Sequence, residues 1–328
     1  MKTLKNIGEF GFIETIKKDF ASAADDKNIT VGIGDDCFCF RNGAKSLTSR
    51  ELCVTKDLLC EDVHFKKEWT TPADLGRKTV EVNVSDIASM GAVRPKYVFI
   101  GFGAPPDTPL NYIKQFYTGV KDACKKYGAQ IAGGDTVKSD KIIISATIIG
   151  ESFGKIIKRS GAKDGDLIGI TNTFGGAGAG VALLYKYGIK RKYSKDELYL
   201  IAKQNKPQAR LKEAFEISKF ASSMTDASDG LFISIALLSK GARVDLEKIS
   251  VSKQLKNVFP DVKKQTEFAL FGAEDYELVF TAPQNSAQKL KKLLPQISYI
   301  GKITNSNKVR YFYNGKEQKT VYAGFKHF

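Results

Sequence analysis

Hydrophobic and polar positions along the first half of the chain follow two different periods. Long stretches with apolar residues three and four positions apart, which are typical of helices, cover residues 72–90 and 110–127. Shorter apolar or alternating runs, which are typical of strands, lie between them. We expect strands at residues 52–56, 96–102, 129–132 and 141–149. The pattern therefore predicts a mixture of helices and strands.

The second half of the chain begins near Lys155 and shows a similar mixture. A strand is expected at residues 167–171, and a glycine-rich run at residues 174–180 precedes a helix. The glycine-rich run is compatible either with a mobile turn or with a loop that faces a phosphate. Residues 185–206 are rich in lysine and tyrosine and weakly apolar, so we expect a surface excursion there.

The length of the chain indicates two domains. At 328 residues it is too long for one ordinary hydrophobic core. We place the boundary so that residues 1–154 form the first domain and residues 155–328 form the second. The expected fold class is α+β, in preference to a simple series of βαβ units.

The composition is that of a soluble globular protein, with 42% apolar and 27% charged residues. No apolar run approaches the length of about 18 residues that a membrane span needs. Residues 1–20 mix charged residues with apolar ones at helical spacing, so they predict an amphipathic helix and not a secretory signal. We expect a soluble enzyme in the cytoplasm, with no membrane partner.

The five cysteines argue against both a disulfide framework and a zinc site. Their number is odd, no Cys-x-x-Cys occurs, and the chain has only two histidines. Cys37 and Cys39 alternate with Phe38 and Phe40, which is typical of small buried residues in a strand. A reducing compartment is therefore expected.

The net charge of +15 raises the question of a nucleic-acid partner, because basic patches attract phosphate. The lysines, however, are spread along the chain as short pairs such as Lys17-Lys18 and Lys125-Lys126. The chain has no long basic block and no basic-aromatic recognition motif. A lysine-rich surface that favours small anionic substrates is the preferred interpretation, and we expect no nucleic-acid partner.

Aspartates lie beside glycines at the ends of several predicted segments. They are Asp36, Asp57, Asp135, Asp226 and Asp229. Each of them alone is readily explained as a turn residue or a helix cap, because aspartate and glycine are the usual residues there. Singly, these residues do not establish a site.

Asp86 is harder to explain as a turn residue, because it lies inside the predicted helix at residues 72–90. At helical spacing its neighbours include Val82 and Met90, so the carboxylate lies on or beside the apolar stripe. A carboxylate there is costly unless it is paired or bound to a metal. Pairing with a distant lysine or arginine remains open, but a metal is preferred. A set of carboxylate and hydroxyl oxygens favours Mg²⁺.

Carboxylates that hold Mg²⁺ are typical of sites where phosphoryl groups move. The common kinase signatures are absent from the sequence, both the Gly-x-x-x-x-Gly-Lys-Ser/Thr loop and the His-Arg-Asp loop. A phosphate monoester has a second pKa of about 6, so as an acceptor it needs no general base. Charge neutralisation and positioning would then suffice, with Arg159 as a candidate anion contact.

These segments, in their order and content, resemble the thiamine-monophosphate kinase family. The resemblance covers nearly the whole chain. It is carried by Gly-Ile-Gly-Asp-Asp-Cys (32–37), the run from Asp57 to Phe65, Asn-Val-Ser-Asp-Ile-Ala-Ser-Met-Gly-Ala (83–92), Gly-Gly-Asp-Thr (133–136), Arg-Ser-Gly-Ala (159–162) with Gly165-Asp166, Ser-Asp-Gly-Leu (228–231), Glu-Asp-Tyr-Glu-Leu (274–278) and Gly-Phe-Lys-His-Phe (324–328).

The resemblance implies an ATP- and Mg²⁺-dependent transfer of phosphate to thiamine monophosphate. It also implies a homodimer formed through an N-terminal α/β domain, a C-terminal α+β domain, and several Mg²⁺ ions with ATP in the cleft between the domains. By similarity, the metal ligands would be Asp36, Thr55, Asp57, Asp86, Asp135, Asp226 and Asp229. ATP would contact Tyr117, Gly134, Asp135, Arg159 and Ser228, and thiamine monophosphate would contact His64, Glu274 and Phe325.

Two positions depart from the family pattern. Lys56 stands where the family has a small hydroxyl residue, and Ala273 replaces the glycine before Glu274. The same superfamily includes selenophosphate synthetases, which carry a reactive cysteine or selenocysteine near the N-terminus, whereas the first cysteine here is Cys37. Its hydrogenase-maturation members end in cysteine, whereas this chain ends in Phe328. A protein that binds ATP or nucleic acid without catalysis is a further alternative.

Overall fold

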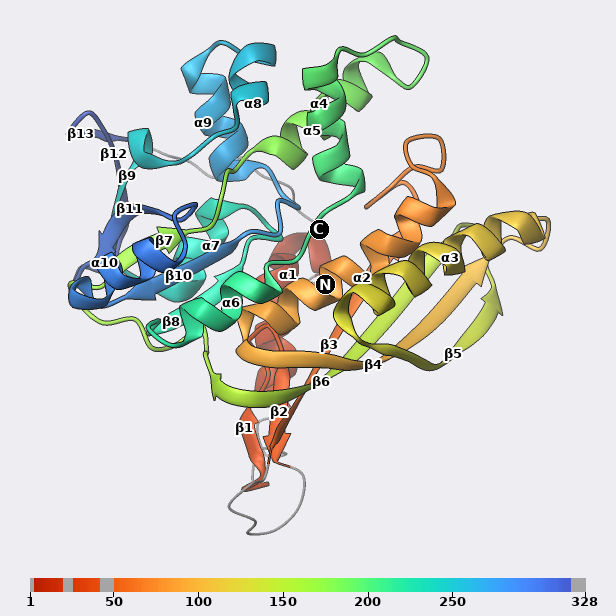
Figure 1. Ribbon diagram of the computed structural model, residues 1–328, viewed down its shortest axis with the longest axis horizontal. Helices are drawn as coiled ribbons and strands as arrows, with labels where there is room; N and C mark the ends of the chain where they lie inside the picture. The colour runs from red at the N-terminus through yellow and green to blue at the C-terminus, as the bar shows by residue number, and fades with distance from the viewer. Residues whose placement is uncertain (1–2, 20–25, 42–49, 320–328) are drawn as a thin grey trace.

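The computed structural model describes residues 3–19, 26–41 and 50–319, and it has two sheets that are each accompanied by helices (Figure 1). The first sheet has the strand order β1-β2-β3-β6-β4-β5. Its strands are β1 (Ile29–Val31), β2 (Phe38–Arg41), β3 (Glu51–Cys60), β4 (Gly91–Ala104), β5 (Gln130–Lys138) and β6 (Ile143–Ile156). Only the β4–β5 pair is parallel among the paired strands of this sheet that the structure describes.

Helices α2 (Pro72–Ser89) and α3 (Leu110–Tyr127) pack against each other beside the first sheet (Figure 1). Helix α2 begins where the Thr71 side chain accepts a hydrogen bond from the backbone N–H of Asp74. The two helices approach so closely that a Cβ on Gly119 would lie 1.8 Å from the carbonyl oxygen of Ala73. Helix α2 contacts α3, strands of the first sheet, and α6 and β8 of the second half, so most of its side chains are buried.

The opposite face of the first sheet carries exposed apolar side chains. They are Leu58 on β3, Tyr97 and Phe99 on β4, and Val137 on β5. Alternation along a strand places every second residue on this face, while Val98, Ile100 and Phe102 point inward to the core. The sheet is thus covered on one face only within a single copy of the described chain.

The second sheet has the strand order β13-β12-β9-β11-β7-β10-β8. Its strands are β7 (Leu167–Ile170), β8 (Ser223–Asp226), β9 (Ala242–Asp245), β10 (Leu278–Ala282), β11 (Ser298–Ile303), β12 (Val309–Tyr313) and β13 (Lys316–Gln318). The remaining helices are α1 (Leu4–Asp19), α4 (Gly176–Tyr187), α5 (Lys195–Asn205), α6 (Leu211–Ser218), α7 (Leu231–Leu238), the short 3₁₀ turn η2 (Leu246–Lys248), α8 (Lys253–Val258), α9 (Val262–Phe271) and α10 (Gln284–Leu293). The predicted α+β class is confirmed, with a mainly antiparallel sheet in this half.

The expectation of a surface excursion at residues 185–206 is wrong for its second part. Helix α5 lies there and packs along α4, with Leu200 and Ile201 in a shared hydrophobic core. The helix starts at a capping box, in which Ser194 and Glu197 satisfy each other's backbone N–H groups. The capping residues outweigh the weak apolar pattern that suggested a loop.

The glycines of the 174–180 run permit close packing of helices. A Cβ on Gly178 would lie 2.8 Å from the Cα of Gly272, and a Cβ on Gly180 would lie 2.3 Å from the carbonyl oxygen of Leu200. The N-terminus of α4 is occupied by a protein carboxylate, because Asp275 accepts hydrogen bonds from the backbone N–H groups of Gly175 and Ala177. A protein carboxylate therefore already occupies the anion position at the helix start, which argues against a phosphate bound there.

Gly180→Ala is expected to lower the free energy of unfolding by about 1–3 kcal/mol, because the new methyl group would push α4 away from α5. Urea denaturation measures the loss. Gly176→Ala on the same helix is the matched control, since its Cβ would meet the flexible side chain of Lys203 at 3.1 Å. Equal losses in the two variants would contradict close packing as the reason for glycine at position 180.

Candidate active site

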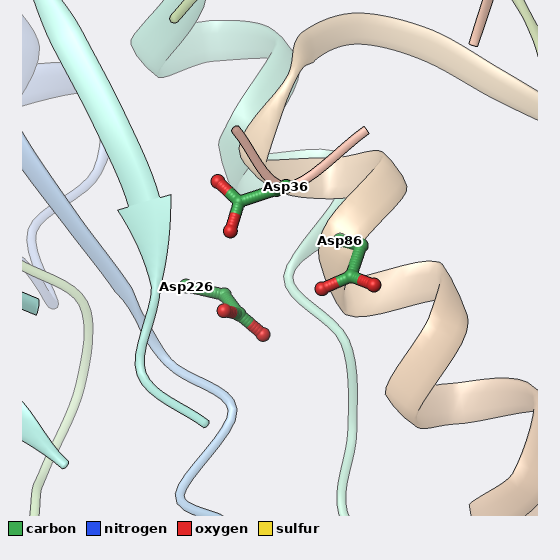
Figure 2. A group of neighbouring side chains, drawn as sticks. All are labelled: Asp36, Asp86 and Asp226. Atoms are coloured by element: carbon green, nitrogen blue, oxygen red, sulfur yellow. The ribbon is translucent and has the colours of Figure 1, made fainter. Parts of the chain in front are cut away.

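Three aspartates that are far apart in the sequence meet between β8 and α2 (Figure 2). Asp36 lies in the loop that joins β1 and β2, Asp86 lies on α2, and Asp226 is the last residue of β8. Each offers a carboxylate oxygen, and the three oxygens all lie within 4.8 Å of one another. The cluster therefore joins elements from both halves of the chain.

Hydroxyl groups and one arginine hold these carboxylates in place. Thr55 donates a hydrogen bond to Asp86, and Ser85 donates one of 2.6 Å to Asp226. Arg159 forms an ion pair with Asp36, whose side chain is only 1% exposed. The predicted position of Asp86 beside the apolar stripe is confirmed, since Val82 and Met90 are both in the buried core.

The three carboxylates are unfavourable neighbours when they are ionised without a cation. Burial raises the pKa of Asp86 well above its usual value, and the neighbouring carboxylates raise it further. Burial and the charge of Asp36 raise the pKa of Asp226 to about 7. The Oδ2 atom of Asp36 is buried and has no hydrogen-bond partner in the part of the chain that the structure describes.

A hard divalent cation fits this set of oxygen atoms. Carboxylate and hydroxyl oxygens are the ligands that Mg²⁺ prefers, and a cation would satisfy the unpaired oxygen of Asp36. It would also offset the repulsion that raises the pKa values of Asp86 and Asp226. The residues present therefore fit a magnesium site.

Mg²⁺ is expected to raise the melting temperature of metal-free protein. A ligand that binds only the folded state stabilises it by about 2.7 kcal/mol at 100 times its Kd. Thermal denaturation with and without a chelator measures the effect. The same rise with NaCl at equal ionic strength, or an undiminished rise in Asp226→Asn, would contradict a specific cation site.

A cavity of about 1370 Å³ opens beside the cluster. Pockets for single small ligands usually hold about 300–1,000 Å³, so this one has room for two. The predicted site residues that line it are Asp36, Thr55, Asp57, His64, Asp86, Arg159, Ser228, Asp229 and Glu274. Burial and the charge of Asp229 raise the pKa of Asp57 to about 6, so these two carboxylates extend the acidic region.

His64 is held in one tautomer by the backbone. The N–H of Cys60 donates a hydrogen bond of 3.1 Å to His64 Nδ1, which must therefore be the acceptor nitrogen. The proton of the neutral imidazole then lies on Nε2. His64 is consequently a donor through Nε2, which is the polarity that contact with a phosphate requires.

Glu274 lies on a strained turn and already has a cationic partner. Its φ angle is 67°, in the left-handed region that few residues other than glycine adopt. Lys78 Nζ lies 2.9 Å from Glu274, and the lysine side chain is only 3% exposed. Gln204 donates a second hydrogen bond to the same carboxylate, and Lys78 also donates to the carbonyl oxygen of His64. One buried lysine thus links two predicted substrate contacts.

The structure does not bring every predicted site residue to the cavity. Gly134 and Asp135 lie on β5, which is exposed along its length, and Asp135 pairs with Gly101 on the outer face of the first sheet. That face is opposite to the one that carries α2 and Asp86. Tyr117 packs against Phe102 and Phe116 in the first core. The assignments of these residues remain predictions, and Phe325 lies outside the described residues.

Lys56 points away from the acidic region. It alternates on β3 with Thr55 and Asp57, so its side chain lies on the outer face, where Nζ donates a hydrogen bond of 2.6 Å to Ser145. The departure from the family pattern at this position therefore leaves the side chains of Thr55 and Asp57 free to face Asp86. Sequence reasoning did not identify Lys78 or Gln204, because their role depends on contact with Glu274, which is far from both in the sequence.

Comparison with known proteins covers both halves. The family models for the "AIR synthase related protein, N-terminal domain" and "C-terminal domain" match residues 34–152 and 163–314. The thiamine-monophosphate kinase of Aquifex aeolicus is 36% identical over 99% of this chain and 99% of its own length. That of Bacillus subtilis is 31% identical over 92% of this chain and 94% of its own length.

Solved structures agree with these matches. The structure of AaThiL complexed with AMPPCP and TMP has a TM-score of 0.86 and 33% identity, and it covers 100% of this chain and 99% of its own. The hydrogenase maturation protein HypE from E. coli has a TM-score of 0.64 at 17% identity, covering 95% of this chain and 98% of its own. The second likeness is one of fold alone.

Proposed function

The chain belongs to the thiamine-monophosphate kinases of the AIR synthase-related family, and on that premise we propose that it transfers the γ-phosphate of ATP to thiamine monophosphate. The products are thiamine diphosphate and ADP. The observation that carries the proposal is the convergence of Asp36, Asp86 and Asp226 beside a cavity with room for two ligands. A relative of the same fold is complexed with AMPPCP, an ATP analogue, together with TMP.

The transfer is direct and in line, without a covalent enzyme intermediate. The acceptor oxygen belongs to a phosphate monoester, which is already largely ionised near neutral pH, so no side chain has to remove a proton. Asp36, Asp86 and Asp226 would hold Mg²⁺, with Thr55 and Asp57 beside them. The ion would supply charge neutralisation and alignment of the phosphate oxygens.

The remaining cavity residues position the two substrates. Arg159 and Ser228, which line the cavity, would contact ATP, and His64 would donate through Nε2 to the phosphate of thiamine monophosphate. Glu274 lies nearby on its strained turn, fixed by Lys78. These side chains are held by backbone and ion-pair contacts before substrate arrives, which lowers the entropic cost of alignment.

Product analysis tests this activity. Purified protein incubated with ATP, Mg²⁺ and thiamine monophosphate should form thiamine diphosphate and ADP in equal amounts. Selenide and a carbamoyl donor, offered in place of thiamine monophosphate, should not stimulate ATP cleavage. Stimulation by either of them, without formation of thiamine diphosphate, would favour the other activities of the superfamily.

We also propose a homodimer formed through the outer face of the first sheet. Val137 is 66% exposed and Leu58 is 50% exposed on that face, where a second copy would remove both from water. Gly134 and Asp135 would then lie at the interface, able to complete a site formed by two copies.

Val137→Asp should shift the mass measured by sedimentation from that of a dimer to that of a monomer. A wild-type protein that sediments as a monomer would contradict the proposal.

The domain division at residues 154 and 155 and the cytoplasmic location are part of the same proposal. The first sheet ends at Ile156 and the second begins at Leu167, which supports a boundary near that point.

The proposed location in the reducing cytoplasm is supported by the free thiols of the cysteines, which are Cys37, Cys39, Cys53, Cys60 and Cys124. Within the described residues, no helix combines the length and apolar character of a membrane span.

A further inference from the structure

Two aromatic rings form a corner at one end of the cavity. Trp69, in the loop before α2, and Tyr185, on α4, have ring centroids 4.8 Å apart and planes that meet at 86°. The ammonium of Lys66 lies over both, 4.8 Å from the Trp69 ring and 5.2 Å from the Tyr185 ring. All three residues line the same cavity as the acidic cluster.

One side of this corner is fixed and the other is accessible. The carbonyl oxygen of Trp69 accepts a hydrogen bond of 2.6 Å from Asn205, and the indole packs against the core shared by α4 and α5. Tyr185 is 63% exposed, so its ring can be reached from the cavity. A ligand would therefore meet a rigid indole and an accessible phenol ring at right angles.

The corner is already occupied by a cation from the protein. An aromatic face attracts a cation through the negative potential above the ring, and two faces together attract it more strongly. In the part of the chain that the structure describes, the Lys66 ammonium forms no salt bridge within 4.0 Å; it contacts these two rings and feels the charge of Asp62 only at longer range. The carboxylate assigned to the substrate by resemblance, Glu274, is by contrast compensated by Lys78 at 2.9 Å.

We propose that Trp69 and Tyr185 bind the cationic thiazolium ring of thiamine monophosphate, and that the Lys66 ammonium is the internal occupant which this ring displaces. The inference rests on the proposed function for the identity of the ligand. Thiamine monophosphate carries a permanent positive charge on a flat ring. Such a ring suits two aromatic faces better than it suits the carboxylate of Glu274, which is already paired with Lys78. The affinity of the corner for a cation would then contribute to the selectivity of the enzyme for thiamine monophosphate as the phosphate acceptor.

Trp69 is the only tryptophan of the chain, so its fluorescence reports on the corner directly. Thiamine monophosphate added to the full-length protein without ATP should change this fluorescence in a saturable way. Its phosphorylated thiazole fragment, which lacks the positive charge, should do so at least about tenfold more weakly. An equal response to the charged and uncharged compounds would overturn the role of the cation.

Substitutions at the exposed ring provide the second test. Tyr185→Leu should raise the KM for thiamine monophosphate about tenfold and leave the KM for ATP unchanged, while Tyr185→Phe restores the affinity. Tyr187→Leu is the matched control, because Tyr187 lies on the same helix but is stacked with Arg191 away from the cavity. Lys66→Met should lower the KM for thiamine monophosphate about two- to fivefold, by removing the competing cation.

The outcomes separate this inference from the proposed function. Formation of thiamine diphosphate with an unchanged KM in Tyr185→Leu would overturn the aromatic site and leave the kinase activity standing. A fluorescence response that Tyr185→Leu abolishes, without any product from the wild type, would support the site and refute the activity. A raised KM in Lys66→Met would overturn the role of Lys66 as a displaced occupant.

Discussion

Asp86→Asn is expected to lower turnover by on the order of 10³-fold while the fold stays intact. Asparagine keeps the shape of the side chain and can still accept the hydrogen bond from Thr55. It removes the charge that would attract a divalent cation, and with it one of the three carboxylates that meet within 4.8 Å. Because the ionised carboxylate is disfavoured by burial, its loss should not destabilise the metal-free protein.

Steady-state kinetics and thermal denaturation together measure this effect. The variant should lose the rise in melting temperature that Mg²⁺ gives the wild type. Asp107→Asn is the matched control, since Asp107 is exposed and does not line the cavity. Turnover within about tenfold of wild type in Asp86→Asn would show that this carboxylate is not a metal ligand.

Arg210→Met is expected to cost about 3–5 kcal/mol of folding free energy, because it leaves a buried carboxylate without its cation. The Glu277 side chain is only 1% exposed, and Arg210 contacts both of its oxygens, at 2.5 and 2.8 Å. Thr171 and Asn172 also donate to the same carboxylate, at 2.6 and 2.8 Å. Those two hydrogen bonds cannot replace the lost positive charge.

Urea denaturation of the variant measures the loss. Arg243→Met is the control, because its ion pair with Asp245 involves an arginine side chain that is 42% exposed and should contribute little. Replacing both partners, as Arg210→Met with Glu277→Leu, should recover part of the stability, since no buried charge then remains unpaired. A loss in Arg210→Met no larger than that in Arg243→Met would contradict this role of the pair.

The helices that could be predicted from the sequence are those with a long apolar stripe at helical spacing. Helix α3 has the predicted bounds, and α2 ends one residue before the predicted position. Their long, regular apolar stripes reflect burial against one sheet, and Asp86 was recognisable as an exception within such a stripe. The predicted burial of Cys37 and Cys39 is also confirmed, although Cys39 lies on β2 and Cys37 directly precedes it.

Other features depend on contacts between distant segments, which spacing along the chain cannot reveal. In the Glu-Asp-Tyr-Glu segment, Glu274 pairs with Lys78 on α2, whereas Glu277 pairs with Arg210. Asp275 between them caps α4. Three carboxylates in four residues therefore have three different partners, and only the folded chain assigns them.

Asp135 illustrates a limit of reasoning from a motif. Taken alone, the Gly-Gly-Asp-Thr segment was readily explained as a turn, but in the structure it forms part of β5. A bulge between Val98 and Phe99 sets the register of β5 against β4, and it places Asp135 opposite Gly101. The face on which a side chain lies depends on that register, which the sequence pattern alone does not contain.

The central claim is that Asp36, Asp86 and Asp226 together bind the divalent cation that serves phosphate transfer. Anomalous diffraction from crystals grown with Mn²⁺, an ATP analogue and thiamine monophosphate tests it most directly. We expect an anomalous peak at about 2.0–2.3 Å from an oxygen of each of the three carboxylates. Crystals prepared at a Mn²⁺ concentration that supports turnover, but without a peak at the cluster, would contradict the claim.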